Sequence, residues 1–117
     1  MDADAFLILA LSLPETALCS HMRNPDIRVA GKIFAGPVGP RGAAILKLTA
    51  EQQEMMCAAE PSIFEPEPGY WGRVGWTRLV VEAADEAMVQ SALWTAWRNV
   101  ASKTLVKAHE PKPEGPV

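Results

Sequence analysis

The stretch Gly69-Tyr70-Trp71-Gly72-Arg73-Val74-Gly75-Trp76-Thr77-Arg78 guides the interpretation of the whole chain. It contains three glycines, the only tyrosine and two of the four tryptophans. Glycine adopts positive φ at no steric cost, so these glycines predict a backbone that bends tightly and repeatedly. From Trp76 to Val81 the residues are mostly aromatic or β-branched, which is typical of a strand. We therefore expect a tight loop over residues 69–75 that leads directly into a strand.

The composition is that of a globular protein, with 117 residues and a net charge of −3. We expect one domain over residues 2–109 and a disordered, proline-rich tail over residues 110–117. Cys19 and Cys57 are too few for a disulfide framework, and free thiols are typical of a reducing compartment. The apolar run 5–11 follows two aspartates instead of positive charge and is too short to span a bilayer. We expect a cytoplasmic protein without membrane contact.

The first half of the chain predicts one helix and three strands. An apolar helix begins after Asp2 or Asp4, which are good N-cap residues, and ends before Pro14. Residues 15–25 are expected to form a connection. Residues 27–35 form a hairpin that turns at a glycine, and residues 44–48 form a third strand.

The second half predicts two more strands and two more helices. Thr49 and Gln52 form a capping box that opens a helix to Ala59, with Met55, Met56 and Ala59 as candidates for its buried stripe. Residues 63–65 lie between prolines and suit an edge strand. A last helix runs from residue 86 to about residue 106, with an apolar stripe of Val89, Leu93, Ala96, Trp97 and Val100.

The predicted order of elements is α-β-β-β-α-β-β-α, which indicates an α+β fold. We expect two layers, an antiparallel sheet of about five strands with helices on one face. Alternation along the strands then turns charged and aromatic side chains to the uncovered face. With the rims and the glycine-rich loop included, this candidate surface consists of Arg28, Lys32, Lys47, Trp71, Arg73, Trp76 and Arg78.

Four stretches resemble the MmcQ/YjbR family of small bacterial proteins, and the similarity covers roughly residues 6–108. These stretches are Leu11–Pro14, Ile27–Phe34, Trp71–Thr77, and Ala96–Arg98 together with Lys103. The resemblance implies an α+β domain that binds DNA through two wing-like hairpins. The first wing is the hairpin around Gly31 and Lys32, and the second is the loop over residues 69–75. Val74 stands where relatives commonly have a second basic residue, and Ser102 where they often have proline.

Cations attract phosphates, and aromatic rings stack on unpaired bases. The predicted face therefore indicates nucleic-acid binding, to DNA or to a single strand. Two alternatives remain open. The indoles of Trp71 and Trp76 can pack beneath the loop while the charges only solvate the sheet. The acidic net charge and the apolar first helix instead favour a protein-interaction or adaptor module, a monomer or weak homodimer.

No catalysis, cofactor or metal is expected. The pair Cys19 and His21 lacks the further ligands that a zinc site needs, and no nucleophile–base pair can be assembled from sequence. The glycine-rich residues 36–42 lack the Gly-Lys-Ser/Thr ending of a phosphate loop.

Overall fold

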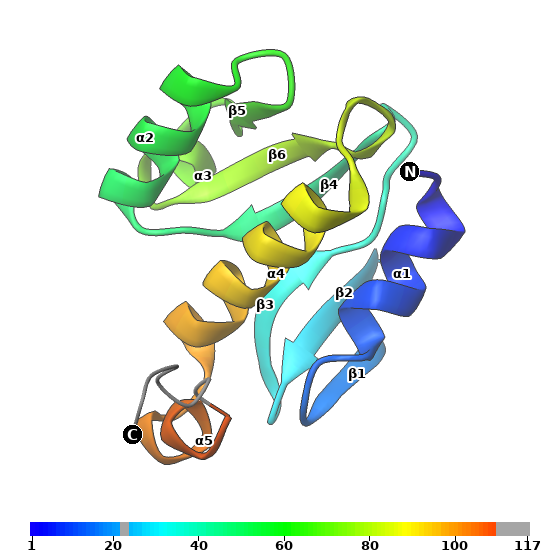
Figure 1. Cartoon of the computed structure of the whole chain (residues 1–117), viewed down its shortest axis with the longest axis vertical. Coiled ribbons are helices and arrows are strands. Elements are labelled where there is room, and N and C mark those ends of the chain that lie inside the picture. The colour runs from blue at the N-terminus through cyan, green and yellow to red at the C-terminus, as the bar shows by residue number, and fades with distance from the viewer. Residues whose placement is uncertain (22–23, 110–117) are drawn as a thin grey trace, which may run out of the picture.

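The computed structural model describes residues 1–21 and 24–109, except for the side chain of His21. The tail predicted to be disordered, residues 110–117, lies outside the described residues. In this part of the chain, six antiparallel strands form one sheet in the order β1-β2-β3-β4-β6-β5 (Figure 1). The strands are β1 (Thr16–His21), β2 (Asn24–Val29), β3 (Lys32–Gly36), β4 (Ala43–Lys47), β5 (Phe64–Pro66) and β6 (Trp76–Val80).

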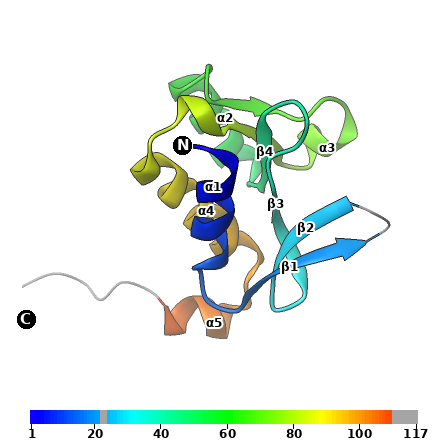
Figure 2. The same ribbon diagram turned by 90° about the vertical axis from the view of Figure 1, so that its right-hand side faces the viewer.

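The helices confirm the two-layer α+β class predicted from the sequence. Helices α1 (Ala3–Leu11) and α4 (Glu86–Val100) cover one face of the sheet, and α2 (Ala50–Ala59) packs beside β5 (Figures 1 and 2). Figure 2 shows the β1–β2 hairpin and the short helix α3 (Tyr70–Arg73) projecting on the opposite side. A 3₁₀ turn, η1 (Val81–Ala83), follows β6, and α5 (Lys103–Ala108) ends the described chain.

The N-cap residues predicted from the sequence lie at the starts of the helices. Asp2 and Asp85 accept hydrogen bonds from the amides of Ala5 and Met88 at 2.8 Å, which satisfies free N–H groups at the starts of α1 and α4. The capping box at the start of α2 is complete in both directions. Within the described residues, none of the helices combines the length and apolar character that a bilayer crossing requires.

The core lies between the sheet and the helices α1 and α4. The predicted stripe of α4 is largely confirmed, because Val89, Leu93, Ala96 and Trp97 are buried and Val100 is partly buried. The alternation of β6 is also confirmed: Thr77 and Leu79 are buried while Trp76, Arg78 and Val80 remain partly exposed. The largest fully buried apolar side chains are Phe6, Ile27, Val29, Phe34, Leu46, Leu48, Leu79, Val81, Val89, Leu93 and Trp97.

The predicted connection over residues 15–25 is wrong, and it accounts for the sixth strand. Residues 16–21 form β1, which pairs along its whole length with β2, from Thr16 opposite Val29 to His21 opposite Asn24. The chain enters this strand through Glu15, which adopts a φ of 59°. Local sequence signals are weak here, so pairing with the neighbouring strand decides the conformation.

Three further expectations need correction. The segment over residues 69–75 is not an open loop, because it contains the helical turn α3. The last helix breaks at Ala101, where ψ is 152°, and Ser102 caps the new helix α5 through the amide of Leu105. The buried stripe predicted for α2 is not formed, since Met55 is 65% exposed and Ala59 is exposed, whereas Met56 packs partly buried against the core.

Candidate binding surface on the uncovered sheet face

The sheet face opposite α1 and α4, which we name the open face, carries side chains from every strand between β2 and β6. Cross-strand pairing places Ile45 beside Arg78 and Arg78 beside Glu65. It also places Lys47 directly beside Trp76. The register therefore brings the predicted residues Arg28, Lys47, Trp76 and Arg78 to this face.

We call the stretch over residues 69–78 the motif. Its backbone over residues 69–76 lies close to neighbouring segments, and this explains two of the motif glycines. A Cβ atom on Gly72 would lie 1.8 Å from the carbonyl oxygen of Glu67, and one on Gly75 would lie 2.0 Å from the carbonyl oxygen of Leu48. Gly75 also has a φ of 106°, a conformation that side chains disfavour. The approach leaves no room for a side chain at either position.

A single glutamine fastens this segment to α2. The side-chain amide of Gln53 donates to the carbonyl oxygens of Gly72 at 3.0 Å and Trp76 at 3.2 Å, and to the hydroxyl of Thr77 at 3.0 Å. The Thr77 hydroxyl in turn donates to the carbonyl oxygen of Gly75 at 3.0 Å. These bonds fix the backbone that carries both motif indoles.

The motif aromatics are presented to solvent and not packed beneath the segment. Trp71 is 61% exposed and Tyr70 is 59% exposed, and their ring centroids lie 5.5 Å apart. Trp76 is partly exposed. The rings of Tyr70 and Trp71 therefore lie at the surface of the domain.

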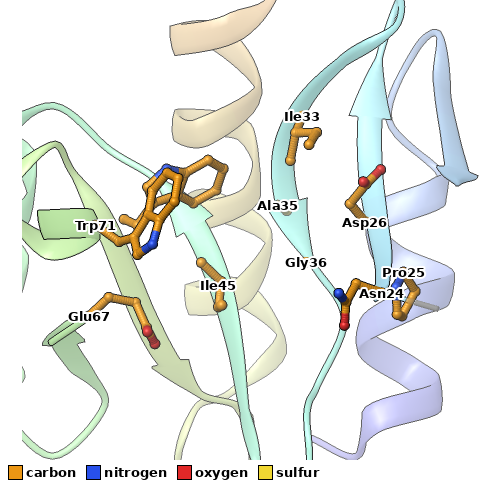
Figure 3. Close-up of a pocket in the computed structure, with 10 residues that line it drawn as sticks. Asn24, Pro25, Asp26, Ile33, Ala35, Gly36, Ile45, Glu67 and Trp71 are labelled. Atoms are coloured by element: carbon orange, nitrogen blue, oxygen red, sulfur yellow. The ribbon is translucent and has the colours of Figure 1, made fainter. Parts of the chain in front are cut away.

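Trp71 and Trp76 border a hollow of about 410 Å³ on the open face (Figure 3). Ile45, Ala35 and Gly36 lie across its centre, and the opposite side is formed by β2 and by Ile33. The volume falls within the range of about 300–1,000 Å³ that is usual for small-ligand sites. The lining residues are Asn24, Pro25, Asp26, Ile33, Ala35, Gly36, Ile45, Glu67, Trp71 and Trp76.

The open face is less basic than the sequence predicted, because carboxylates pair with its arginines. Arg28 donates to both carboxylate oxygens of Asp26, at 2.7 and 3.1 Å. These hydrogen bonds and the charge of Asp26 raise the pKa of Arg28 above its ordinary value. Arg78 lies 3.1 Å from a carboxylate oxygen of Glu65 and 3.5 Å from one of Glu67.

The remaining predicted cations occupy three different settings. The ammonium group of Lys47 donates to the carbonyl oxygen of Val74 and lies 5.6 Å from the ring centroid of Trp76. Arg73 is exposed on α3 and does not line the hollow. Lys32 is exposed but lies opposite Val29, whose side chain faces the core, so the register does not place Lys32 on the open face.

Sequence reasoning missed the acidic members of this surface, Asp26, Glu65 and Glu67. Residues two apart on a strand share a face. The spacing of Glu65 and Glu67 around Pro66 therefore carried a signal that both carboxylates lie on the same side. Asp26 gave a similar signal, two residues before Arg28.

The thiols and acids of the sequence are possible metal ligands. Cys19 and Cys57 are free and partly exposed, and burial raises the pKa of the Cys57 thiol. Within residues 1–21 and 24–109, no three histidine, cysteine, aspartate or glutamate side chains gather closely enough to hold a metal ion.

The family model named YjbR matches residues 11–99, which include β1 to β6 and nearly all of α4. The chain belongs to the YjbR family. This confirms the resemblance inferred from the four sequence stretches.

One solved structure shares the fold of this YjbR domain. It is the crystal structure of Deinococcus radiodurans protein DR2400, a DUF419 domain, with a TM-score of 0.71 and 14% sequence identity. The alignment covers 92% of this chain and 86% of the other. At this identity the similarity establishes the fold and not the function. None of the curated proteins with which the sequence was compared matches it.

Proposed function

We propose that this YjbR domain binds single-stranded nucleic acid on its open face, mainly by stacking unpaired bases on the exposed indole of Trp71. The observation that carries the proposal is the exposure of Trp71 at the edge of an apolar hollow on an uncovered sheet. Stacking on an aromatic side chain contributes about 1–3 kcal/mol per base and tolerates many sequences. We assign to this face a role in binding and not in catalysis.

Because the arginines of the open face are already paired with carboxylates, we expect electrostatic attraction to phosphates to contribute little to the binding affinity. Arg28 and Arg78 are paired with carboxylates, while Lys47 lies over the ring of Trp76 and Arg73 is exposed on α3. A binder of this kind contacts few phosphates, so its affinity falls only gently as salt rises. We expect a slope of log K against log salt of about −0.7 to −1.4, set by one or two phosphate contacts of a single strand. A wing that binds the phosphate backbone of a duplex requires more unpaired cations than this face offers.

The test is fluorescence anisotropy of a labelled twelve-nucleotide single strand, d(GT)6, titrated with the wild-type protein and with Trp71→Ala. Loss of one stacking platform is expected to weaken binding about tenfold. Ile8→Ala is the control, because it also truncates an exposed apolar side chain, on α1 and away from the open face. Equal affinity of wild type and Trp71→Ala would refute the proposal, as would a complete absence of binding at low salt.

A second candidate function, self-association, is favoured by the surface near β1. Ile8 on α1 is 72% exposed and Leu18 on β1 is 46% exposed. The edge strand β1 contains neither proline nor a lysine, arginine or acidic residue, the features that usually block strand addition. A second copy could pair through β1 in antiparallel fashion. Sedimentation over a range of protein concentrations tests this, and an unchanged monomer mass at high concentration would exclude it.

A further inference from the structure

Among the residues that the structure describes, the ionisable side chains that line the hollow are both acids, although Arg28, Lys47 and Arg78 lie on the same face. The two acids are Asp26 and Glu67, and Asn24 adds a side-chain amide. Figure 3 shows them on opposite sides, with Glu67 on the side of Trp71 and Asp26 across the floor from it. A base stacked on Trp71 therefore lies nearer to Glu67 than to the far side of the hollow. Carboxylate oxygens accept hydrogen bonds, so the hollow suits a ligand group that donates them.

Both carboxylates are held in place by arginines. The Asp26 side chain is 15% exposed and carries two bonds from Arg28, and the Glu67 side chain is 24% exposed and lies 3.5 Å from Arg78 Nε. Such pairing orients a partly buried carboxylate. A carboxylate has about four acceptor sites, so the contact of Glu67 with Arg78 leaves capacity for a ligand N–H.

Nucleobases differ in what they offer to a carboxylate. Guanine presents its N1–H and its 2-amino group side by side, which matches the two oxygens of one carboxylate. Cytosine and adenine present one amino group each. Thymine and uracil flank their single N–H with carbonyl oxygens, which a carboxylate repels. A bidentate contact between a side chain and a base edge is a strong source of discrimination between bases.

We infer that the hollow between Trp71 and β2 is a base-selective subsite in which Glu67 accepts hydrogen bonds from the Watson–Crick edge of an unpaired guanine. This inference rests on the proposed function, since it assumes that a single strand reaches the open face. Trp71 supplies the stacking platform and Glu67 supplies the selectivity. Bases without an amino group bind with the stacking contribution alone.

The test compares d(GT)6 with d(IT)6, in which inosine replaces guanosine and removes only the 2-amino group. Wild-type protein is expected to bind d(GT)6 about fivefold more tightly, near the lower end of the discrimination that a bidentate contact provides. Glu67→Gln is expected to remove this difference while keeping the size of the side chain. Thermal melting of the variant checks that its fold is retained.

Glu65→Gln is the matched control. Glu65 also pairs with Arg78, at 3.1 Å, but its side chain is 58% exposed and does not line the hollow. It is expected to retain the preference for d(GT)6. Equal binding of d(GT)6 and d(IT)6 by the wild type would overturn the inference while leaving the proposed function intact. So would a preference that survives in Glu67→Gln. Failure of both strands to bind would overturn the proposed function itself.

Discussion

Replacing Gly75 by alanine tests the packing that presents the motif indoles. The new Cβ would lie 2.0 Å from the carbonyl oxygen of Leu48, which belongs to the backbone and cannot rotate away. The residue would also adopt a φ of 106°, which costs about 1 kcal/mol or more for a residue with a side chain. Relieving the clash means moving Gly75 away from Leu48.

That movement breaks defined hydrogen bonds. The carbonyl oxygen of Gly75 accepts from the amide of Leu48 and from the hydroxyl of Thr77, both at 3.0 Å. Each bond contributes about 1 kcal/mol to stability. Together with the backbone strain, we expect Gly75→Ala to lower the free energy of unfolding by about 3 kcal/mol. This is a large share of the stability of about 5–15 kcal/mol that is usual for a domain.

Urea denaturation followed by tryptophan fluorescence measures the loss. Gly69→Ala is the matched control, because Gly69 has a φ of 73° in the same segment but no atom within 4 Å of the position of a Cβ. It should lose only the strain contribution, about 1 kcal/mol. If Gly75→Ala is no less stable than Gly69→Ala, Gly75 does not pack closely against Leu48. This contact would then not position the indoles.

Three other changes test separate parts of the structure. Gln53→Glu removes the donor that faces three oxygen atoms and should cost about 2 kcal/mol or more in urea denaturation, whereas Gln90→Glu, on the exposed side of α4, should cost little. Because burial raises the pKa of the Cys57 thiol, its thiolate forms only at higher pH than in an exposed cysteine. In a Cys19→Ser background, the alkylation rate of Cys57 by iodoacetamide should therefore rise at a higher pH than that of free cysteine, and an unshifted profile would contradict this. Trp97→Phe loses the indole hydrogen bond of 2.9 Å to the carbonyl oxygen of Pro14 and should lower the unfolding free energy by about 2 kcal/mol, unlike a substitution at an exposed site.

The parts of the fold that could be predicted are those where local sequence and tertiary structure agree. The capping box of α2, the apolar stripe of α4 and the alternation along β6 each follow from side-chain chemistry and the period of the element. The edge strand β5 was predictable because proline cannot donate to a sheet ladder.

The errors arose where distant contacts decide the conformation. Residues 16–21 carry no strong strand signal and become β1 because β2 offers a complete set of pairing partners. Glycines suggested a loop at residues 69–75, but hydrogen bonds from Gly75 to Gly72 and from Val74 to Tyr70 close a helical turn there. The break before α5 had a local signal that was overlooked, the capping residue Ser102.

The candidate site was predictable in its aromatic and cationic members but not in its charge. Strand alternation alone placed Trp76, Arg78 and Lys47 on one face. The neutralising pairs depend on the order of strands, because β5 returns beside β6 and brings Glu65 against Arg78. Sheet order of this kind cannot be read from the period of a single strand. Where the sequence predicted a basic face, the structure therefore has an aromatic hollow with acidic groups at its sides.

The most direct test of the central claim is ultraviolet cross-linking to a twelve-nucleotide single strand that carries 5-iodocytosine, followed by mass spectrometry of the cross-linked peptides. If unpaired bases stack on the open face, the cross-links map to residues 70–76, the segment that holds Tyr70, Trp71 and Trp76. Cross-links confined to Trp94 on α4, on the covered side of the sheet, would contradict the account.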